Sequence, residues 1–282
     1  MTPLRVVPVP STGLPKSGLQ WNERWRRVTL LEHISMGIFG VGSLVANELP
    51  ARNTGRWDNA FDDGIRDALR AESYETRRAT ATASDMFYYG LMAYPILVDT
   101  LFVAGLQNTD VAWQMTVMNL NSLALSGMLS IMLERVFGRE HPFVRECAAD
   151  PGYDPDCDGP GEKINVSFPS GHTIMASTGA GLICAHHLNL PLYGGGWPDV
   201  LACGTAITVA GFQGFFRLTA DRHYATDVIA FSLVGFGSGF LLPSLLHYKN
   251  WINNTDKASL PRVSIVPFAS DTGGGLIASG FL

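Results

Sequence analysis

Charged residues are scarce in this chain. Asp, Glu, Lys and Arg make up 16% of its 282 residues, whereas about a quarter is usual in soluble domains. Residues 111–133, 173–198, 200–216 and 228–248 contain none of the four. The net charge of −5 also excludes the basic surface that nucleic-acid binding needs, so we expect no nucleic-acid partner.

The charge-free stretches are of the right length to cross a membrane, because a spanning helix needs about 20 largely apolar residues. Two weaker segments precede them, residues 33–47 and residues 86–106, the second with Asp99 inside it. No tryptophan lies in the middle of a stretch, as expected of indoles that favour the headgroup region. We therefore predict an all-α, six-helix transmembrane bundle. A soluble all-α protein with long buried helices is the alternative.

The termini are unlike the rest of the chain. The first 27 residues are polar and Pro-rich and lack the apolar core of a signal peptide. Arg24, Arg26 and Arg27 precede the first predicted span and favour a cytoplasmic N-terminus. We predict an extended N-terminal tail (1–27), a membrane-embedded domain (28–248) and a C-terminal tail (249–282). Inside the domain, the periodicity of residues 58–78 predicts an amphipathic connector helix.

Cysteine is also rare, with four in the chain. Cys147 and Cys157 bracket a loop rich in Asp, Pro and Gly, and this spacing suits either a disulfide or a free pair. A disulfide would place the loop between the third and fourth spans in an oxidising compartment. Cys184 and Cys203 lie inside apolar segments, where we expect them to be small buried hydrophobic residues.

Residues 169–172 read Pro-Ser-Gly-His at the start of an apolar segment. Ser170 is a good helix N-cap, and Gly171 lets a ligand approach the backbone. The free N–H groups at such a helix start form an anion site, and His172 would lie beside a bound anion. A plain helix cap with an incidental histidine is the alternative.

A second polar stretch contains Arg217, His223 and Asp227. On a helix, His223 and Asp227 would share one face, so the carboxylate can fix the imidazole tautomer and leave the other ring nitrogen as a nucleophile. Arg217 can bind phosphoryl oxygens in bidentate fashion. A surface ion pair is the alternative. An arginine here would repel a metal cation, so we expect no metal.

These two motifs resemble those of the phosphatidic acid phosphatase type 2 superfamily, which also contains the vanadium-dependent haloperoxidases. The signature of that family has three parts: Lys, six residues and Arg-Pro; then Pro-Ser-Gly-His; then Ser-Arg, five residues, His, three residues and Asp. The second part matches in full. The third matches except that Phe216 replaces the serine.

This sequence departs from the first part of the signature. Aligned on Pro142, the lysine position falls on Glu134 and the arginine position on His141. Arg135 and Arg139 are neighbouring cations, and Arg139 is the better substitute because it lies closer to the proline.

The resemblance implies roles for these residues. His223 attacks phosphorus and forms a phosphohistidine, with Asp227 orienting it, while His172 protonates the leaving alcohol and then activates water. The phosphoryl oxygens are held electrostatically. The candidates for this second role are Arg217, Arg139, the backbone N–H groups of Ser170 and Gly171, Arg135 and His141.

The function implied is metal- and cofactor-independent hydrolysis of a lipid phosphomonoester or pyrophosphate. The implied location is a bacterial inner membrane with the active site facing the periplasm, where the partners are the lipid substrate and membrane lipid. Two alternatives stay open. One is a pseudoenzyme that binds phosphate or lipid without turnover, which Glu134 and His141 would explain. The other is a vanadate-dependent haloperoxidase.

Overall fold

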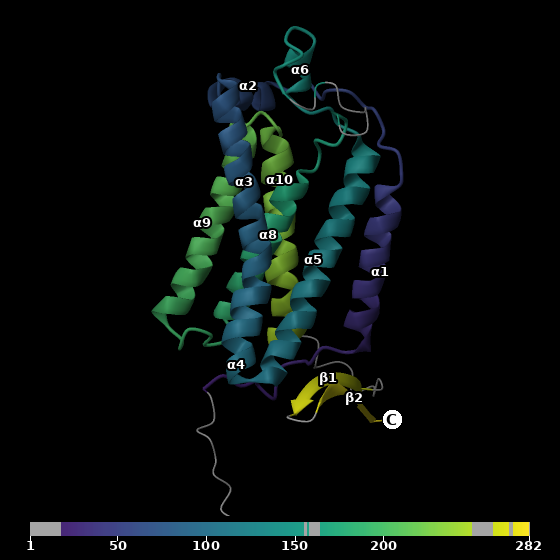
Figure 1. Ribbon diagram of the computed structural model, residues 1–282, viewed down its shortest axis with the longest axis vertical. Helices are drawn as coiled ribbons and strands as arrows, with labels where there is room; N and C mark the ends of the chain where they lie inside the picture. Colours follow the sequence, from purple (N-terminus) through teal and green to yellow (C-terminus); the bar gives the residue numbers. More distant parts are fainter. Residues whose placement is uncertain (1–17, 155–156, 158–163, 250–261, 271–272, 282) are drawn as a thin grey trace, which may run out of the picture.

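A computed structural model describes residues 18–154, 157, 164–249, 262–270 and 273–281. Long helices run along one axis and form an elongated bundle (Figure 1). They are α1 (Leu30–Asn47), α3 (Tyr74–Tyr94), α5 (Thr109–Phe137), α8 (Gly171–His187), α9 (Trp197–Thr219) and α10 (Ala225–Pro243). The π-helices η1 (Pro95–Ala104) and η2 (Ser244–Tyr248) continue α3 and α10. The short helices are α2 (Ala60–Leu69), α4 (Gly105–Gln107) and α6 (Val144–Cys147).

Among the described residues, five helical segments are long and apolar enough to cross a membrane: Leu30–Asn47, Tyr74–Gln107, Thr109–Phe137, Trp197–Thr219 and Ala225–Tyr248. Large apolar side chains on them face outward, including Ile38, Leu106 and Leu233, which are 61%, 83% and 72% exposed. The predicted bundle of apolar helices is confirmed, with five helices of spanning length in the described residues rather than six.

The sixth predicted span corresponds to α8, which has 17 residues. The charge-free run of residues 173–198 is longer than this helix because α8 ends at His187, and a turn containing Pro191 and three consecutive glycines follows. Charge alone does not reveal where a helix ends inside an apolar run. The predicted connector helix is likewise divided, because Arg70 leaves helical geometry after α2 and Ser73 caps a new helix, α3.

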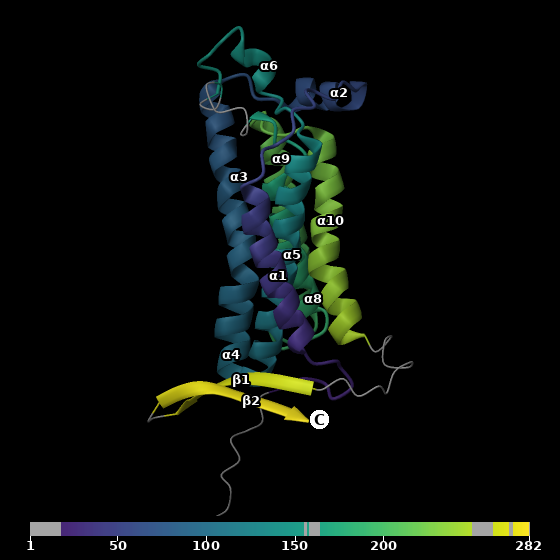
Figure 2. The same ribbon diagram turned by 90° about the vertical axis from the view of Figure 1, so that its right-hand side faces the viewer.

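α8 is the central helix and packs against α3, α5, α9 and α10 (Figures 1 and 2). At Gly239 of α10, an added Cβ would lie 2.0 Å from the carbonyl oxygen of Thr178, so the two backbones touch. Small residues permit such close packing in a bilayer. The N–H of Ser170 also reaches the carbonyl oxygen of Asp227 at 3.5 Å, so the start of α8 lies beside the first turn of α10 at the upper end of the bundle.

A disulfide joins α8 to α9 through Cys184 and Cys203, whose Cα atoms are 4.4 Å apart. We predicted two unpaired, buried residues, and this prediction is wrong. The burial itself is as expected for Cys184, which is fully enclosed. The pairing follows from the packing of two helices whose neighbourhood the sequence does not reveal.

The structure describes part of each predicted tail, and residues 1–17 and 250–261 lie outside the described residues. Residues 18–29 have no helix and pack under the bundle. Leu19 is fully buried, and Trp21 and Trp25 contact the ring of Tyr248. In the C-terminal tail, β1 (Arg262–Ser270) and β2 (Gly273–Phe281) form an antiparallel hairpin in which Arg262 pairs with Phe281. The all-α prediction did not include this hairpin.

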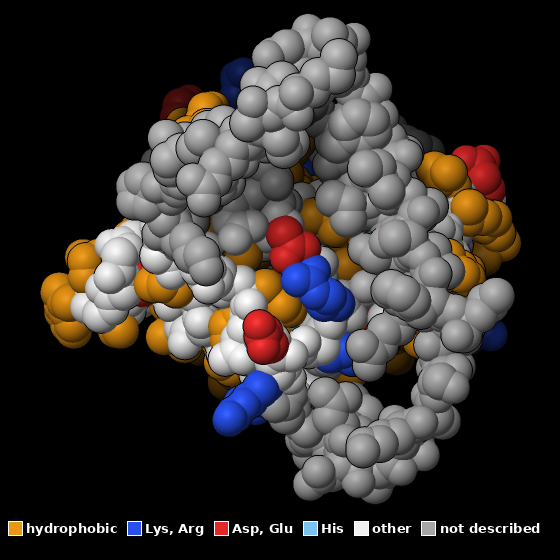
Figure 3. Space-filling view, turned by 90° about the horizontal axis from the view of Figure 1, so that it is seen from below, with side chains coloured by type: hydrophobic (Ala, Val, Ile, Leu, Met, Phe, Trp, Pro, Cys, Tyr) orange, Lys and Arg blue, Asp and Glu red, His pale blue; other side chains and the backbone are white. Residues whose placement is uncertain are grey.

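Both ends of the bundle are polar. At the lower end Arg27 pairs with Asp110 and Arg26 with Glu32, and Figure 3 shows acidic and basic side chains there with apolar side chains around the rim. The loops that follow α5 and α9 lie at the opposite, upper end (Figure 1). These loops carry the polar motifs, so the functional residues gather at one end of an apolar bundle.

Candidate active site

His223 lies in the short loop between α9 and α10 and is 6% exposed. Its Nδ1 is 2.9 Å from the backbone carbonyl of Ser167. A carbonyl only accepts, so Nδ1 carries the proton and Nε2 keeps its lone pair. Burial, followed by the positive charge of Arg217, lowers the pKa of His223 well below its usual value. The ring is therefore neutral, the form that a nucleophilic imidazole requires.

Asp227, in the first turn of α10, is fully buried close to His223. Its Oδ2 is 3.8 Å from His223 Nδ1 and accepts hydrogen bonds from the Ser167 hydroxyl (2.7 Å) and the Tyr224 N–H (2.9 Å). Ser167 thus bonds both residues, with its hydroxyl on the carboxylate and its carbonyl on the imidazole. We expected the Asp227 carboxylate to accept the His223 proton directly, but the carbonyl of Ser167 accepts it instead, which no motif had indicated.

His141 joins the site from the loop after α5. Its Nδ1 donates to the backbone carbonyl of Arg222 at 2.5 Å, and its ring meets that of His223 with centroids 5.1 Å apart. Burial lowers the pKa of His141 to about 3. His141 is therefore a neutral neighbour of the candidate nucleophile.

His172 and Arg217 meet at a residue that the sequence did not indicate, Asp85 of α3. One carboxylate oxygen of Asp85 is 3.3 Å from His172 Nε2 and 3.2 Å from Arg217 Nη1. The Arg217 side chain is 9% exposed, and its Nε has no partner among the described residues. The sequence signal that could have indicated Asp85 is its position, because it is an acidic residue directly before the apolar segment of residues 86–106.

Comparison with known proteins agrees with this geometry. The profile of the PAP2 superfamily matches residues 116–251, which contain α8, α9, α10 and both motifs. This region of the chain is therefore similar to the PAP2 superfamily. No curated protein and no solved structure matches the chain. The PAP2 match indicates a phosphatase-type activity, and together with the apolar helices it indicates a membrane protein.

Arg139, which we expected to bind phosphate in place of the cations of the PAP2 signature, lies beneath the site. Its guanidinium is fully buried and contacts two carboxylates, Asp227 and Asp62, the latter at 2.7 Å. It also lies over the rings of Trp57 and Tyr224. The structure thus makes Arg139 a buried link between α2 and α10 rather than a phosphate ligand.

A left-handed glycine directs Arg139 inward. Gly138 ends α5 with φ of +57°, and a Cβ there would lie 2.1 Å from the carbonyl oxygen of Arg52. Only glycine fits this turn. Arg135, one helical turn earlier, donates instead to the carbonyl of Asn47 at 3.2 Å. Both arginines, which we expected to bind phosphate, therefore bond other protein groups in the structure.

The start of α8 has the predicted cap. The Ser170 hydroxyl accepts from the N–H of Thr173, while the N–H of Ser170 points to the carbonyl of Asp227 at 3.5 Å. At Gly171 an added Cβ would lie 2.8 Å from an oxygen of Glu134. The acid at the lysine position of the PAP2 signature therefore lies beside the helix start that we expected to bind an anion.

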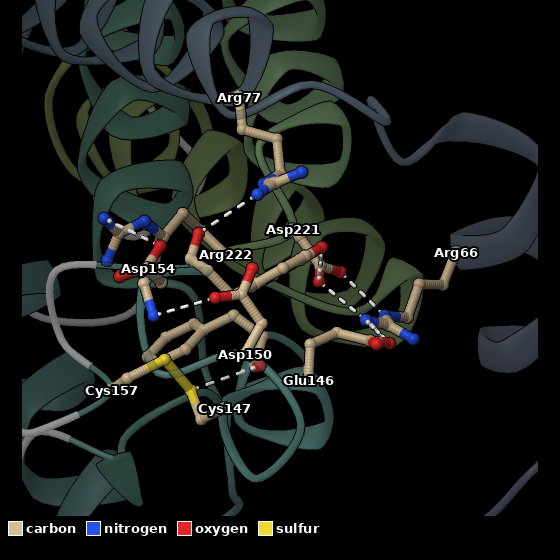
Figure 4. The surroundings of a disulfide bond; sticks show 12 residues. Arg66, Arg77, Glu146, Cys147, Asp150, Asp154, Cys157, Asp221 and Arg222 are labelled. Atoms are coloured by element: carbon tan, nitrogen blue, oxygen red, sulfur yellow. Dashed lines mark hydrogen bonds and ion pairs between the residues drawn. A yellow bond between two sulfur atoms is a disulfide. The ribbon is translucent and has the colours of Figure 1, made fainter.

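The loop after α6 carries the predicted disulfide between Cys147 and Cys157. Next to it, Arg66 of α2 contacts Asp221 at 2.7 Å and Glu146 at 3.1 Å (Figure 4). These ion pairs connect the disulfide loop to the loop between α9 and α10.

A second contact reinforces this connection, because Arg222 pairs with Asp154 at 3.2 Å. Asp221 and Arg222 directly precede His223 in the chain. The disulfide loop therefore holds the backbone that positions the candidate nucleophile. Within the described parts of the chain, no group of three His, Cys, Asp or Glu side chains is arranged to hold a metal ion.

Proposed function

We propose that this protein hydrolyses a lipid phosphomonoester or pyrophosphate through a phosphohistidine, without a metal. The observation that carries the proposal is the state of His223. Its proton is on Nδ1, held by the Ser167 carbonyl, and the charge of Arg217 together with burial keeps the ring neutral. The lone pair of Nε2 is then available next to a cation that attracts phosphate.

In the proposed first step, His223 Nε2 attacks phosphorus and the bond to the leaving oxygen breaks. Arg217 holds the phosphoryl oxygens, and His172 gives a proton to the leaving alkoxide. In the second step His172 takes a proton from water, the resulting hydroxide attacks the phosphohistidine, and inorganic phosphate leaves. The ring of His141 contacts that of His223 but is uncharged. Arg217 is therefore the main cation that holds the phosphoryl oxygens in this scheme.

The apolar outer surface of the bundle supports a lipid substrate. With the bundle in a bilayer, its upper end lies at the level of the lipid headgroups. We propose residues 28–248 as the membrane-embedded phosphatase domain. The disulfide Cys147–Cys157 favours an oxidising compartment at the upper end. We therefore propose a bacterial inner membrane with the site facing the periplasm.

The test is phosphate release from a panel of lipid phosphates and pyrophosphates by detergent-purified protein in EDTA. His223→Ala should reduce release by at least about a thousandfold, because it removes the nucleophile. His33→Ala is the matched control, because His33 lies on α1 and stacks on Trp113; this variant should keep wild-type activity. Equal release by His223→Ala and wild type would exclude His223 as the nucleophile.

A second candidate function is a pseudoenzyme that binds phosphate or lipid without turnover. The acid at the PAP2 lysine position favours it, since an oxygen of Glu134 lies beside the first turn of α8 and would repel a phosphate dianion. Asp85 on Arg217 adds a second negative charge. Binding of a lipid phosphate by folded protein, with no release from any substrate, would support this candidate.

A further inference from the structure

Asp85 contacts the acid–base histidine and the phosphate-binding arginine at once. One oxygen of its carboxylate lies 3.3 Å from His172 Nε2 and 3.2 Å from Arg217 Nη1. The three residues come from α3, α8 and α9. The Asp85 side chain is 45% exposed and that of His172 36%, so this meeting point is open to a ligand rather than sealed in the core.

Packing holds Asp85 in this place. The neighbouring residue Ser84 is fully buried and accepts a hydrogen bond from Gln213 of α9 at 3.1 Å. Further along α3, an added Cβ at Gly179 of α8 would lie 2.2 Å from the carbonyl oxygen of Leu91. The backbones of α3 and α8 therefore touch, and α3 cannot withdraw from the site without losing these contacts.

We infer that Asp85 is a positioning residue for His172 and a charge that tunes the anion affinity of Arg217, an inference whose catalytic part rests on the proposed function. A carboxylate only accepts, so Asp85 favours the forms of His172 that carry a proton on Nε2. The carboxylate also stabilises the imidazolium that forms when His172 takes a proton from water. The two histidines with a proposed catalytic role then each have a neighbouring carboxylate, Asp227 beside His223 and Asp85 beside His172.

The same carboxylate opposes substrate binding. A phosphate on Arg217 must share the guanidinium with Asp85, and two anions a few ångströms apart repel each other. Removing the charge of Asp85 should therefore strengthen anion binding and slow the chemical step. A residue that only supported the fold would weaken both when it was removed.

The experiment uses the full-length protein in detergent and the variant Asp85→Asn, which keeps the side-chain size. Binding of orthovanadate as a phosphate analogue and kcat on the best lipid phosphate are measured. We expect the Kd for vanadate to fall about five- to tenfold, as one partly screened charge is removed, and kcat to fall at least about tenfold as proton transfer by His172 is impaired. Asp85→Glu should recover part of kcat.

The matched control is Glu75→Gln, which removes one negative charge from an exposed position on the same helix and should change neither quantity. Weaker vanadate binding by Asp85→Asn, or unchanged kcat, would overturn the inference. Failure of wild-type protein to release phosphate from any lipid would instead refute the proposed function. In that case the vanadate measurement still decides on Asp85, because an unchanged Kd would overturn its assigned contact with Arg217.

Discussion

Replacing Arg139 with glutamine removes the positive charge that lies between two buried carboxylates. The guanidinium is 0% exposed, and its partners Asp62 and Asp227 are 1% and 0% exposed. In the variant, both carboxylates stay in the interior without their cation. We expect a large loss of stability, whereas a phosphate ligand at the surface of the site would be lost with little effect on folding.

Breaking a buried ion pair by removing one partner typically costs about 3–5 kcal/mol. For a chain of this size, each kcal/mol lowers the melting temperature by roughly 2–4 °C. Arg139→Gln should therefore melt roughly 6–20 °C below wild type. The double variant Asp62→Asn/Arg139→Gln should recover part of the loss, because one of the two uncompensated charges is then gone.

The assay is thermal unfolding in detergent beside phosphate-release kinetics. Arg135→Gln serves as the control, since Arg135 is a nearby arginine that bonds only the backbone and side chain of Asn47; its effect should stay within about 0.5 kcal/mol. A wild-type melting temperature for Arg139→Gln combined with a raised KM would refute the reasoning, because it would show that the guanidinium serves the substrate.

Two further predictions concern stability. The double variant Cys147→Ser/Cys157→Ser should lose about 2–3 kcal/mol, because the disulfide closes a loop with a sequence separation of 10; equal melting temperatures with and without the bridge would contradict it. Wild type should also lose stability on acidification from pH 6.5 to 5. The folded protein holds His141 neutral with a pKa of about 3, against a usual value of 6.5, so the unfolded chain takes up this proton first and stability falls between these values. His141→Asn should lose about 1.5 kcal/mol less over that interval, and identical pH dependences of the two melting temperatures would exclude this role for His141.

Much of the architecture follows from local composition. An apolar layer excludes charge from any helix that crosses it, so uncharged runs such as residues 200–216 locate helices without knowledge of their neighbours. The ends of helices are harder to predict from the sequence. α8 stops at His187 inside an uncharged run, and Ser73 starts α3 inside a periodic one, because caps and turns depend on few residues.

Neighbours within the motifs follow from spacing along the chain, although His223 lies in the loop before α10 and not on a helix as predicted. His223 and Asp227 lie near each other, and Ser170 caps α8. The partners outside the motifs were not predicted. Asp85 is 132 positions from Arg217, and Asp62 is 77 from Arg139, so only the packing of helices brings them together.

The sequence by itself predicted a bundle of apolar helices of spanning length, with motif residues His172, Arg217 and Asp227 near the ends of these helices. These properties depend on composition and on residues a few positions apart. The tertiary structure decided which charged side chains form ion pairs with one another. It placed Arg139 between Asp62 and Asp227, left Arg217 with Asp85, and paired Cys184 with Cys203. Such pairings depend on which helices are neighbours, and the close backbone contacts of α8 with α3 and α10 set that arrangement.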